Sequence, residues 1–398
     1  MSENLIQIRQ NQRRNTIFNL IQKQNRQLSR FDICKITKYS TTTVKGLVDD
    51  LISDGLISEV ERMDNRVGRR PSFLAVEDDA LYFAGMECSS AAVNFTVINA
   101  AQQVIHHQTM HLSDPLTQDI LNAMQQILTD YSEKEPVIWE KIPTISFAIP
   151  GKLDCENGIG IQYGNIYDWK HIDFKKLFSV FGKSLCFFSN VDSMLNGYRQ
   201  KNNLPADQSI LFIVNRNSVG ARLYANGTLL SQYGVVSEVG HMRAKDSSRR
   251  CSCGRKGCYD TEITVRAINN KLMEACSAHL IDPLLFSGGH PKENIDTFLR
   301  IAATGEQVAS DILSEVLDYT AELIDTMLSF FKPDVIVFSS FLCADERLVE
   351  TQLEQRLSSH HADDMPVFHY ILPANEMASF GAAISAYNDF FPVTQPEI

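Results

Sequence analysis

Near the N-terminus, apolar residues recur at helical spacing in two separate segments. A helix-capping signal between these two segments indicates a further helix. Ile17, Leu20 and Ile21 predict a helix that begins near Arg14. A second helix is expected to start after Ser29, because this hydroxyl cap is followed three residues later by an acid, as in a capping box. The core face expected for the second helix comprises Phe31 and Cys34, with Ile33 beside them.

The third helical pattern is the strongest, with apolar residues at i, i+3, i+4, i+7 and i+8. Its members are Val44, Leu47, Val48, Leu51 and Ile52. Residues 56–60 then alternate as a strand, and residues 72–76 are expected to return antiparallel to them. Three helices and a hairpin predict that residues 1–78 form a winged helix-turn-helix, in which the third helix enters the major groove of DNA.

The residues expected to contact DNA lie at the start of the third helix and in the loop of the hairpin. Short polar side chains and one cation at such a helix end touch base edges and phosphates, and an arginine-rich wing lies along the backbone or in a narrow minor groove. A solvated loop is the alternative for the arginines. The candidates are Ser40, Thr41, Thr42, Thr43, Lys45, Arg66, Arg69 and Arg70.

Beyond residue 80 the pattern changes to strands that alternate with helices. Strands are expected at 81–88, 92–98, 104–110 and 142–148, and helices at 116–131, 307–331 and 378–391. Such alternation predicts an α/β fold with a mixed sheet covered by helices. The helix at 307–331 is expected to pack on a sheet, and a surface helix of this length can also serve a dimer. We find no internal repeat in this region.

Composition and charge agree with two or three soluble domains and place the basic residues at one end. The chain has 398 residues, of which 44% are hydrophobic and 21% charged. It shows no run of eighteen apolar residues and no signal peptide, so we expect a cytoplasmic protein without membrane insertion. Residues 1–71 carry 13 Lys plus Arg against 8 Asp plus Glu, a net of +5 in a chain of net charge −11. This asymmetry indicates a basic head on an acidic body.

A candidate metal site follows residue 240. His241, Cys251, Cys253 and Cys258 combine one imidazole with three thiols, and glycines at 254 and 257 permit the tight turns that would bring them together. This set suits one tetrahedral zinc ion. The alternatives are a disulfide or unrelated buried thiols. The remaining six cysteines are scattered among apolar neighbours, as reduced core cysteines usually are.

Glu238-x-Gly-His241 followed by Cys251-x-Cys-Gly-x-x-Gly-Cys258 resembles the signature of the ROK family, which groups bacterial sugar kinases with sugar-responsive repressors. The resemblance implies that residues 79–398 form a sugar-kinase-like sensor body with two α/β lobes, similar to actin and hexokinase. It also implies a sugar site formed by Asp192, Glu238, His241 and Asp260, with zinc orienting the histidine. Asp192 could instead simply cap a helix. The kinases of the family have no DNA-binding head.

The same resemblance argues against phosphoryl transfer. The kinases cradle ATP in three glycine-rich elements, and the corresponding positions here are 87–91, 217–220 and 339–340, where most of the glycines are missing. We therefore expect a sugar-responsive transcriptional repressor of carbohydrate genes without enzyme activity. Its expected partners are operator DNA, a sugar or sugar-phosphate effector, a second copy in a homodimer or homotetramer, and a transport-system protein. The alternatives are an active sugar kinase with an added head, and a DNA-binding regulator that senses a partner protein.

Overall fold

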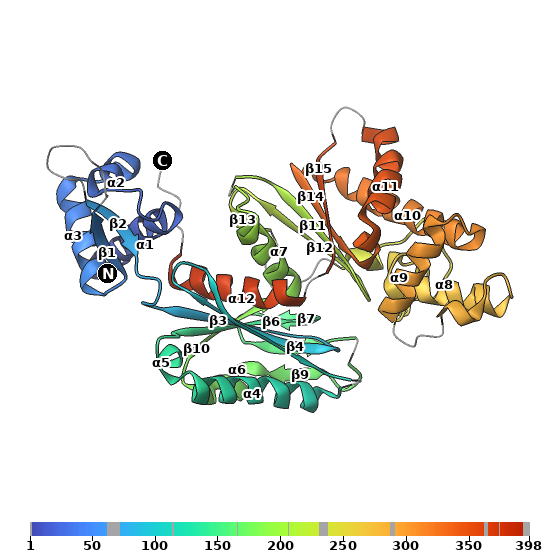
Figure 1. Ribbon diagram of the computed structural model, residues 1–398, viewed down its shortest axis with the longest axis horizontal. Coiled ribbons are helices and arrows are strands. Elements are labelled where there is room, and N and C mark those ends of the chain that lie inside the picture. The colour runs from blue at the N-terminus through green and yellow to red at the C-terminus, as the bar shows by residue number, and fades with distance from the viewer. Residues whose placement is uncertain are drawn as a thin grey trace. The chain divides into compact units, whose positions relative to one another are not determined.

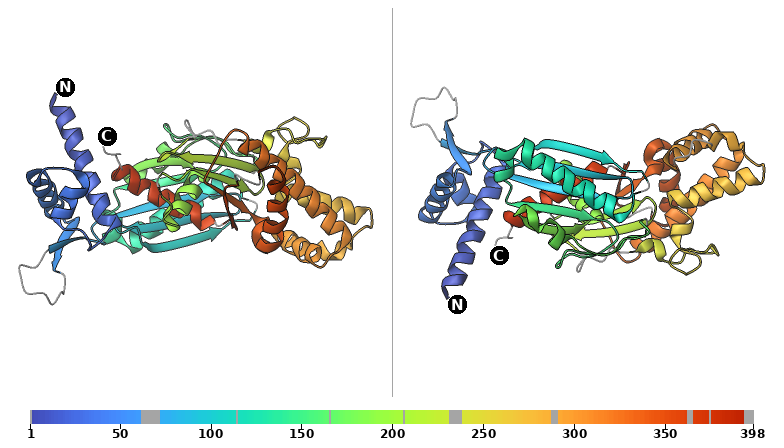
Figure 2. Two further views of the ribbon diagram at one scale, coloured as in Figure 1. Left: turned by 90° about the horizontal axis from the view of Figure 1, so that it is seen from above. Right: turned by 90° about the horizontal axis from the view of Figure 1, so that it is seen from below.

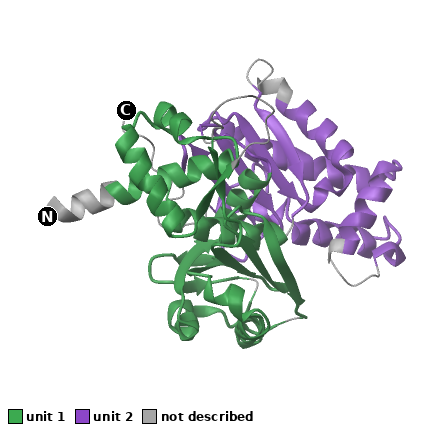
Figure 3. Cartoon of the chain, turned by 60° about the vertical axis from the view of Figure 1, so that its left-hand side comes forward, with its two compact units in different colours: residues 1–201, 375–398 green, residues 202–374 purple. Residues whose placement is uncertain are grey.

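The computed structural model of the chain contains two compact units (Figure 3). Unit 1 comprises residues 1–201 with 375–398, and unit 2 comprises residues 202–374. None of the helices among the described residues is long and apolar enough to span a bilayer. The structure describes residues 2–61, 72–113, 115–164, 166–205, 207–230, 238–286, 291–361, 365–373 and 375–392.

The head, residues 1–78, contains three helices and a two-stranded antiparallel sheet. In β1 and β2, Ile57 pairs with Val76 and Glu61 with Ser72. The arginine-rich residues 62–71 that join these strands lie outside the described part of the chain. The division into compact units falls at residue 201, and the domain boundary near residue 78 stays a prediction. The elements of the head are α1 (Ser2–Lys23), α2 (Arg30–Thr37), α3 (Thr41–Ser53), β1 (Ile57–Glu61) and β2 (Ser72–Val76).

Local signals predicted the second and third helices well. Ser29 caps α2 by accepting the amide of Asp32, and the Asp32 carboxylate accepts the amide of Ser29, which completes the capping box. In α3, four of the five predicted stripe residues are buried, and the fifth, Ile52, is half-buried. The first helix is longer than predicted, because it begins at Ser2 and not near Arg14. Its first half is rich in good helix formers, which extend a helix without needing an apolar stripe.

The expected core face of α2 was wrong in one position. Phe31 is 65% exposed, whereas Ile33 is completely buried and Cys34 is half-buried. Residues that are two positions apart in a helix lie on nearly opposite faces of it, so Phe31 and Ile33 cannot both point into one core. The ring of Phe31 instead lies under the Lys35 ammonium, with 4.4 Å between the nitrogen and the ring centroid.

We expect Ile33→Ala to lower the free energy of unfolding of unit 1 by about 2 to 5 kcal/mol, because it leaves a cavity in the core of the head. Phe31→Ala removes an exposed ring and should change this free energy by about 0.5 kcal/mol or less. Urea titrations followed by circular dichroism would compare the two variants. A larger loss for Phe31→Ala than for Ile33→Ala would contradict the burial described here.

The remainder of unit 1 is built on a five-stranded mixed sheet in the order β10-β6-β3-β4-β5 (Figure 1). Side chains of β3 alternate between its two faces: Ala84 and Met86 pack with α4, whereas Phe83 packs with α12. Both faces of the sheet are therefore covered by helices, as an α/β fold requires. A small sheet, β7-β8-β9, follows β6. The strands are β3 (Tyr82–Cys88), β4 (Ala92–Asn99), β5 (Val104–His111), β6 (Thr144–Ile149), β7 (Lys152–Asp154), β8 (Ile159–Gln162), β9 (Lys170–Asp173) and β10 (Ser184–Ser189). The helices are α4 (Thr117–Lys134), α5 (Pro136–Glu140), α6 (Phe174–Phe178), α7 (Asn190–Lys201) and α12 (Asn375–Phe390).

The C-terminal helix α12 is held against α7 and β3 by direct backbone contact. A Cβ atom added at Gly381 would lie 1.7 Å from the Ser193 carbonyl oxygen of α7, and one added at Gly197 would lie 2.5 Å from the Met377 carbonyl oxygen of α12. On the sheet side, a Cβ atom at Gly85 would lie 2.1 Å from the Ser379 carbonyl oxygen. The three glycines allow main chains to approach more closely than side chains would permit.

The end of α12 also closes the core of the head. The Phe18 ring of α1 stacks on Phe391, with 4.2 Å between ring centroids, and Tyr387 packs beside them. Buried Asn19 donates to the Phe391 carbonyl oxygen at 3.1 Å and accepts from the Tyr387 hydroxyl at 3.3 Å. Figure 2 shows the two helices meeting in both views. The head therefore shares one hydrophobic core with the rest of unit 1.

Unit 2 repeats the sheet topology of unit 1 with different sequence. Its order, β15-β14-β11-β12-β13, places the first strand in the centre, an antiparallel hairpin on one side and two parallel strands on the other. In unit 1, β10-β6-β3-β4-β5 has the same order and directions. The helix predicted at 307–331 is α10, which packs against α8, α9 and α11. The elements are β11 (Ile210–Asn215), β12 (Val219–Ala225), β13 (Thr228–Leu229), α8 (Val265–Ser277), α9 (Pro291–Ala303), α10 (Gln307–Leu328), β14 (Val335–Ser340), α11 (Glu346–His361) and β15 (Val367–Ile371).

Candidate functional site

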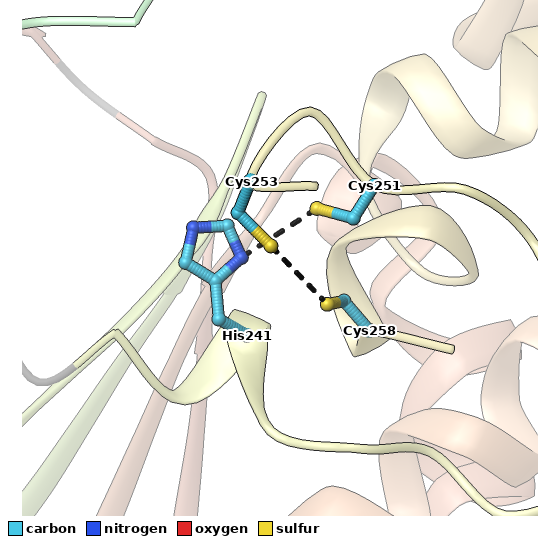
Figure 4. Close-up of side chains that lie close together, drawn as sticks. All are labelled: His241, Cys251, Cys253 and Cys258. Atoms are coloured by element: carbon cyan, nitrogen blue, oxygen red, sulfur yellow. Dashed lines mark hydrogen bonds between the residues drawn. The ribbon is translucent and has the colours of Figure 1, made fainter. Parts of the chain in front are cut away.

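The four candidate metal ligands lie together in unit 2 (Figure 4). His241 ends a short 3-10 helix, Val239–His241, and the cysteines lie on the loop that leads to a second one, Tyr259–Thr261. Gly254 and Gly257 bend this loop in the left-handed region, with φ of 88° and 74°. These turns return Cys258 to the two cysteines before it, as the spacing predicted.

The geometry fits a tetrahedral zinc ion. The Cys251 sulfur lies 3.6 Å from His241 Nδ1, and the Cys253 and Cys258 sulfurs are 3.7 Å apart. All four ligand atoms lie within 4.8 Å of one another. Around an ion with metal–sulfur bonds of about 2.3 Å and metal–nitrogen bonds of about 2.0 Å, neighbouring tetrahedral ligands are about 3.5 to 3.8 Å apart. A small inward adjustment of the side chains would therefore complete the shell.

The thiols differ in their tendency to ionise. Hydrogen bonds from Arg255 lower the pKa of the exposed Cys253 thiol to about 6. Burial raises the pKa of the Cys258 thiol to about 12. The Cys253 and Cys258 sulfurs are within hydrogen-bond distance, so one proton can be shared between them. A zinc ion would displace that proton, because it binds the thiolate and not the thiol.

Asp260 lies beside the same histidine. Its carboxylate is 5% exposed, accepts the Val219 amide at 2.8 Å and lies 3.7 Å from His241 Nδ1. Burial raises the pKa of Asp260, and the Val219 amide opposes this rise. Gly240 makes the arrangement possible, because a Cβ atom there would lie 1.9 Å from an Asp260 oxygen. Figure 4 shows the second ring nitrogen of His241 directed away from the cysteines, which leaves that nitrogen able to bind a ligand.

Glu238 and Asp192 are the other two residues expected at the sugar site. Neither of them is in the contact just described between His241 and Asp260. Glu238 is exposed at the start of the 3-10 helix that ends with His241, and its carbonyl oxygen accepts the His241 amide at 2.9 Å. Asp192 belongs to unit 1, where it is buried in the first turn of α7 and its amide donates to the Ser189 hydroxyl at 3.2 Å. The structure thus brings His241 and Asp260 together in unit 2, with Glu238 nearby in the chain.

The loop that contains Cys251, Cys253 and Cys258 is called the metal loop below. Sequence reasoning missed the buried charged residues that hold this loop in place. Glu262 is 2% exposed and pairs at 3.0 Å with Lys271 of α8, which is 4% exposed and also pairs with Glu315 of α10 at 2.7 Å. Arg249, two residues before the first cysteine, makes two hydrogen bonds of 2.7 Å to Glu274. Buried charges are tolerated only when they are paired, so these contacts fix the loop against two helices. The available signal was a lysine on the otherwise apolar buried face of the amphipathic helix α8.

The candidate DNA-contacting residues of α3 form its exposed N-terminal end. Ser40 caps the helix by accepting the Thr43 amide at 3.1 Å, and the two hydroxyls are 2.8 Å apart. Thr41, Thr42 and Lys45 are exposed. Arg66, Arg69 and Arg70 lie outside the described residues.

Comparisons with known proteins agree on one family. Residues 83–387 match the model of the ROK family. The chain is 23% identical over 348 residues to the DNA-binding transcriptional dual regulator NagC of Escherichia coli (strain K12), covering 83% of this chain and 81% of that protein. It is 20% identical over 357 residues to the xylose repressor of Bacillus subtilis (strain 168), covering 88% of each.

Solved structures share the fold at low sequence identity. A ROK family transcriptional regulator described as a homologue of the Escherichia coli MLC protein superposes with a TM-score of 0.80 at 17% identity, covering 96% of this chain and 97% of that one. A ROK family glucokinase from Streptomyces griseus superposes with a TM-score of 0.62 at 17% identity, covering 76% of this chain and 98% of its own. With its mixed α/β sheets and a family match over most of its length, the chain belongs to the ROK family.

Proposed function

We propose that this protein is a sugar-responsive, DNA-binding repressor of genes for carbohydrate metabolism or transport. The observation that carries the proposal is the extent of the likeness. The regulator's fold covers 96% of this chain, whereas the glucokinase covers 76% of it and almost all of its own length. The glucokinase leaves about a quarter of this chain unmatched, enough for the head, and the three helices and hairpin of the head fit a winged helix-turn-helix.

Two of the three turns that correspond to the nucleotide-binding elements of the kinases support a regulator over a kinase. In the turn between β3 and β4, the Ser89 hydroxyl accepts the amides of Ala91 and Ala92 at 3.4 and 3.2 Å. After β14, the Ser340 hydroxyl accepts the Leu342 amide at 3.2 Å. Amides already bound by serine side chains are not free to bind a nucleotide, and positioning the nucleotide is the main task of a phosphoryl-transfer site.

DNA binding is tested with a fragment library or the region upstream of the gene, at several salt concentrations. We expect Arg69→Ala with Arg70→Ala to weaken binding to all sequences and to flatten the salt dependence by about one unit of slope for each lost phosphate contact. Thr42→Ala should instead alter the preference among sequences, because α3 would read base edges. An unchanged salt slope in the arginine variant would show that the hairpin loop does not contact DNA.

The sugar response is tested by release or recruitment of that DNA in the presence of hexoses, pentoses and their derivatives. We expect Glu238→Gln to abolish the response while zinc content and DNA affinity without sugar are retained, because Glu238 is exposed and contributes no metal ligand. A normal response in this variant would remove Glu238 from the effector site. Sugar-dependent ADP production at ordinary enzymatic turnover would instead favour the kinase alternative.

Within this proposal, zinc bound by His241, Cys251, Cys253 and Cys258 has a structural role and orients His241 toward the effector. Asp192, Glu238 and Asp260 supply the carboxylates that bind sugar hydroxyls. A protein with one head per chain would read a two-fold operator as a homodimer or homotetramer in the cytoplasm. A docking transport-system protein remains a further prediction, which pull-down with purified transport components would test.

A further inference from the structure

A second group of charged residues lies beside the metal loop, around a hollow of about 380 Å³ in unit 2. Its wall includes three arginines, three neutral side chains that can form hydrogen bonds, and the carboxylate of Asp260. We call this hollow the arginine pocket. The residues used below are Arg249, Arg250, Ser252, Asp260, Arg266 and Asn270.

The arginines of the pocket differ in whether their charge is neutralised. Arg249 is held by two bonds of 2.7 Å to Glu274, and its Nε lies 3.8 Å from Glu262. Arg250 and Arg266 are exposed, and neither side chain has an ion pair or hydrogen bond to any residue of the described chain. The two guanidinium groups repel each other, and each matches the planar, two-oxygen edge of a phosphate or carboxylate. The Asp260 carboxylate attracts Arg266 at longer range but forms no ion pair with it.

The start of α8 adds to the positive character of this wall. Thr264 caps the helix by accepting the Ala267 amide at 3.2 Å, and Arg266 occupies the first turn, which contains no acidic residue. The N-terminus of a helix carries a partial positive charge and normally attracts acidic side chains. An anion bound at this position would offset both the charge of Arg266 and the partial charge of the helix end.

Asp260 gives the pocket a second kind of recognition. Its buried carboxylate lines the hollow and also lies beside His241, so one oxygen acceptor is shared between the arginine pocket and the sugar site proposed above. Ser252 and Asn270 add neutral hydrogen-bonding groups to the rim. A ligand that satisfies the whole wall needs hydroxyl donors for Asp260 and an anionic group for Arg250 and Arg266.

We propose that the arginine pocket binds the anionic group of a sugar derivative, a phosphate or a carboxylate, while Asp260 binds hydroxyl groups of the same molecule. This inference rests on the sugar-responsive function proposed above and narrows the effector to a charged sugar. A neutral sugar would leave Arg250 without an anion and Arg266 with only the longer-range attraction of Asp260.

Isothermal titration of the full zinc-loaded chain tests the inference with matched pairs of probes. The pairs are glucose with glucose 6-phosphate and with glucuronate, N-acetylglucosamine with its 6-phosphate, and xylose with its 5-phosphate. We expect an anionic member to bind at least about tenfold more tightly than its neutral partner. Arg266→Gln should weaken binding of that anionic probe about ten- to a hundredfold and leave the neutral partner unchanged, because hydrogen bonds to charged groups are stronger than neutral ones.

Two controls separate a pocket effect from a general effect of charge. Arg266→Lys keeps the positive charge and should recover part of the lost affinity, and Arg300→Gln removes an exposed arginine from α9 and should change nothing. Neutral sugars that bind as tightly as anionic ones, or an Arg266→Gln variant with unchanged affinity, would overturn the pocket and leave the proposed sugar response intact. Failure of every neutral and anionic probe to bind would overturn both proposals.

Discussion

Replacing Cys253 by alanine is expected to remove the metal and to destabilise unit 2 by about 4 kcal/mol or more. Cys253 is exposed, so the substitution itself leaves no cavity in the core. The loss would come from the missing ligand, because three remaining donors hold zinc poorly and the free energy of metal binding is part of the free energy of folding. The loop carrying Asp260 would lose its attachment to His241.

Elemental analysis of protein purified without chelator would measure the metal, and thermal melting with and without chelator would measure its contribution to stability. Cys276→Ser is the matched control, because Cys276 is a buried cysteine of α8 outside the cluster. We expect one zinc per chain in the wild type and in the control. A Cys253→Ala variant that keeps its zinc, or wild-type protein purified without any, would contradict the proposed site.

Gly381→Ala is expected to destabilise unit 1 by about 3 kcal/mol or more, although alanine is the better helix former. The new Cβ atom would lie 1.7 Å from the Ser193 carbonyl oxygen, which is part of the backbone of α7 and cannot rotate away. The two helices would have to separate, and α12 would draw Phe391 away from Phe18 in the head.

Gly46→Ala provides the comparison within the same unit. Gly46 lies in α3, and a Cβ atom added there would meet nothing within 4 Å. The substitution should therefore raise the free energy of unfolding by about 0.5 to 1 kcal/mol through helix propensity alone. Urea titrations of both variants would give opposite signs. A stabilised Gly381→Ala variant would show that α7 and α12 do not touch at this position.

The features that were predicted from the sequence depend on residues close together in the chain. The capping box of Ser29 and Asp32 needs one helical turn, and the buried stripe of α3 needs three. The four candidate metal ligands were identified because their spacing and the glycines between them restrict how the loop can turn. Family resemblance added what spacing alone does not contain, namely the roles of Asp192, Glu238 and Asp260.

Errors arose where a local pattern left two outcomes open. Phe31 and Ile33 are both apolar and lie on different faces of α2, and only the packing of α1 and α3 selects Ile33. The start of α1 was misplaced because polar residues that form helices well have no apolar periodicity to reveal them.

The sequence by itself determined the type and order of the elements in the head, the mixed α/β character of the body and the composition of the metal loop. Only the tertiary structure decided that the C-terminal helix closes the core of the head, that Lys271 pairs with Glu262, and that Arg250 and Arg266 line one hollow beside Asp260. It also revealed that the two five-stranded sheets have the same strand order, which no repeat in the sequence indicated. Local patterns record the preferences of neighbouring residues, whereas these features join segments that lie far apart in the chain, such as Asn19 and Phe391. Whether such segments meet depends on the path of the whole backbone and on which buried groups can pair there.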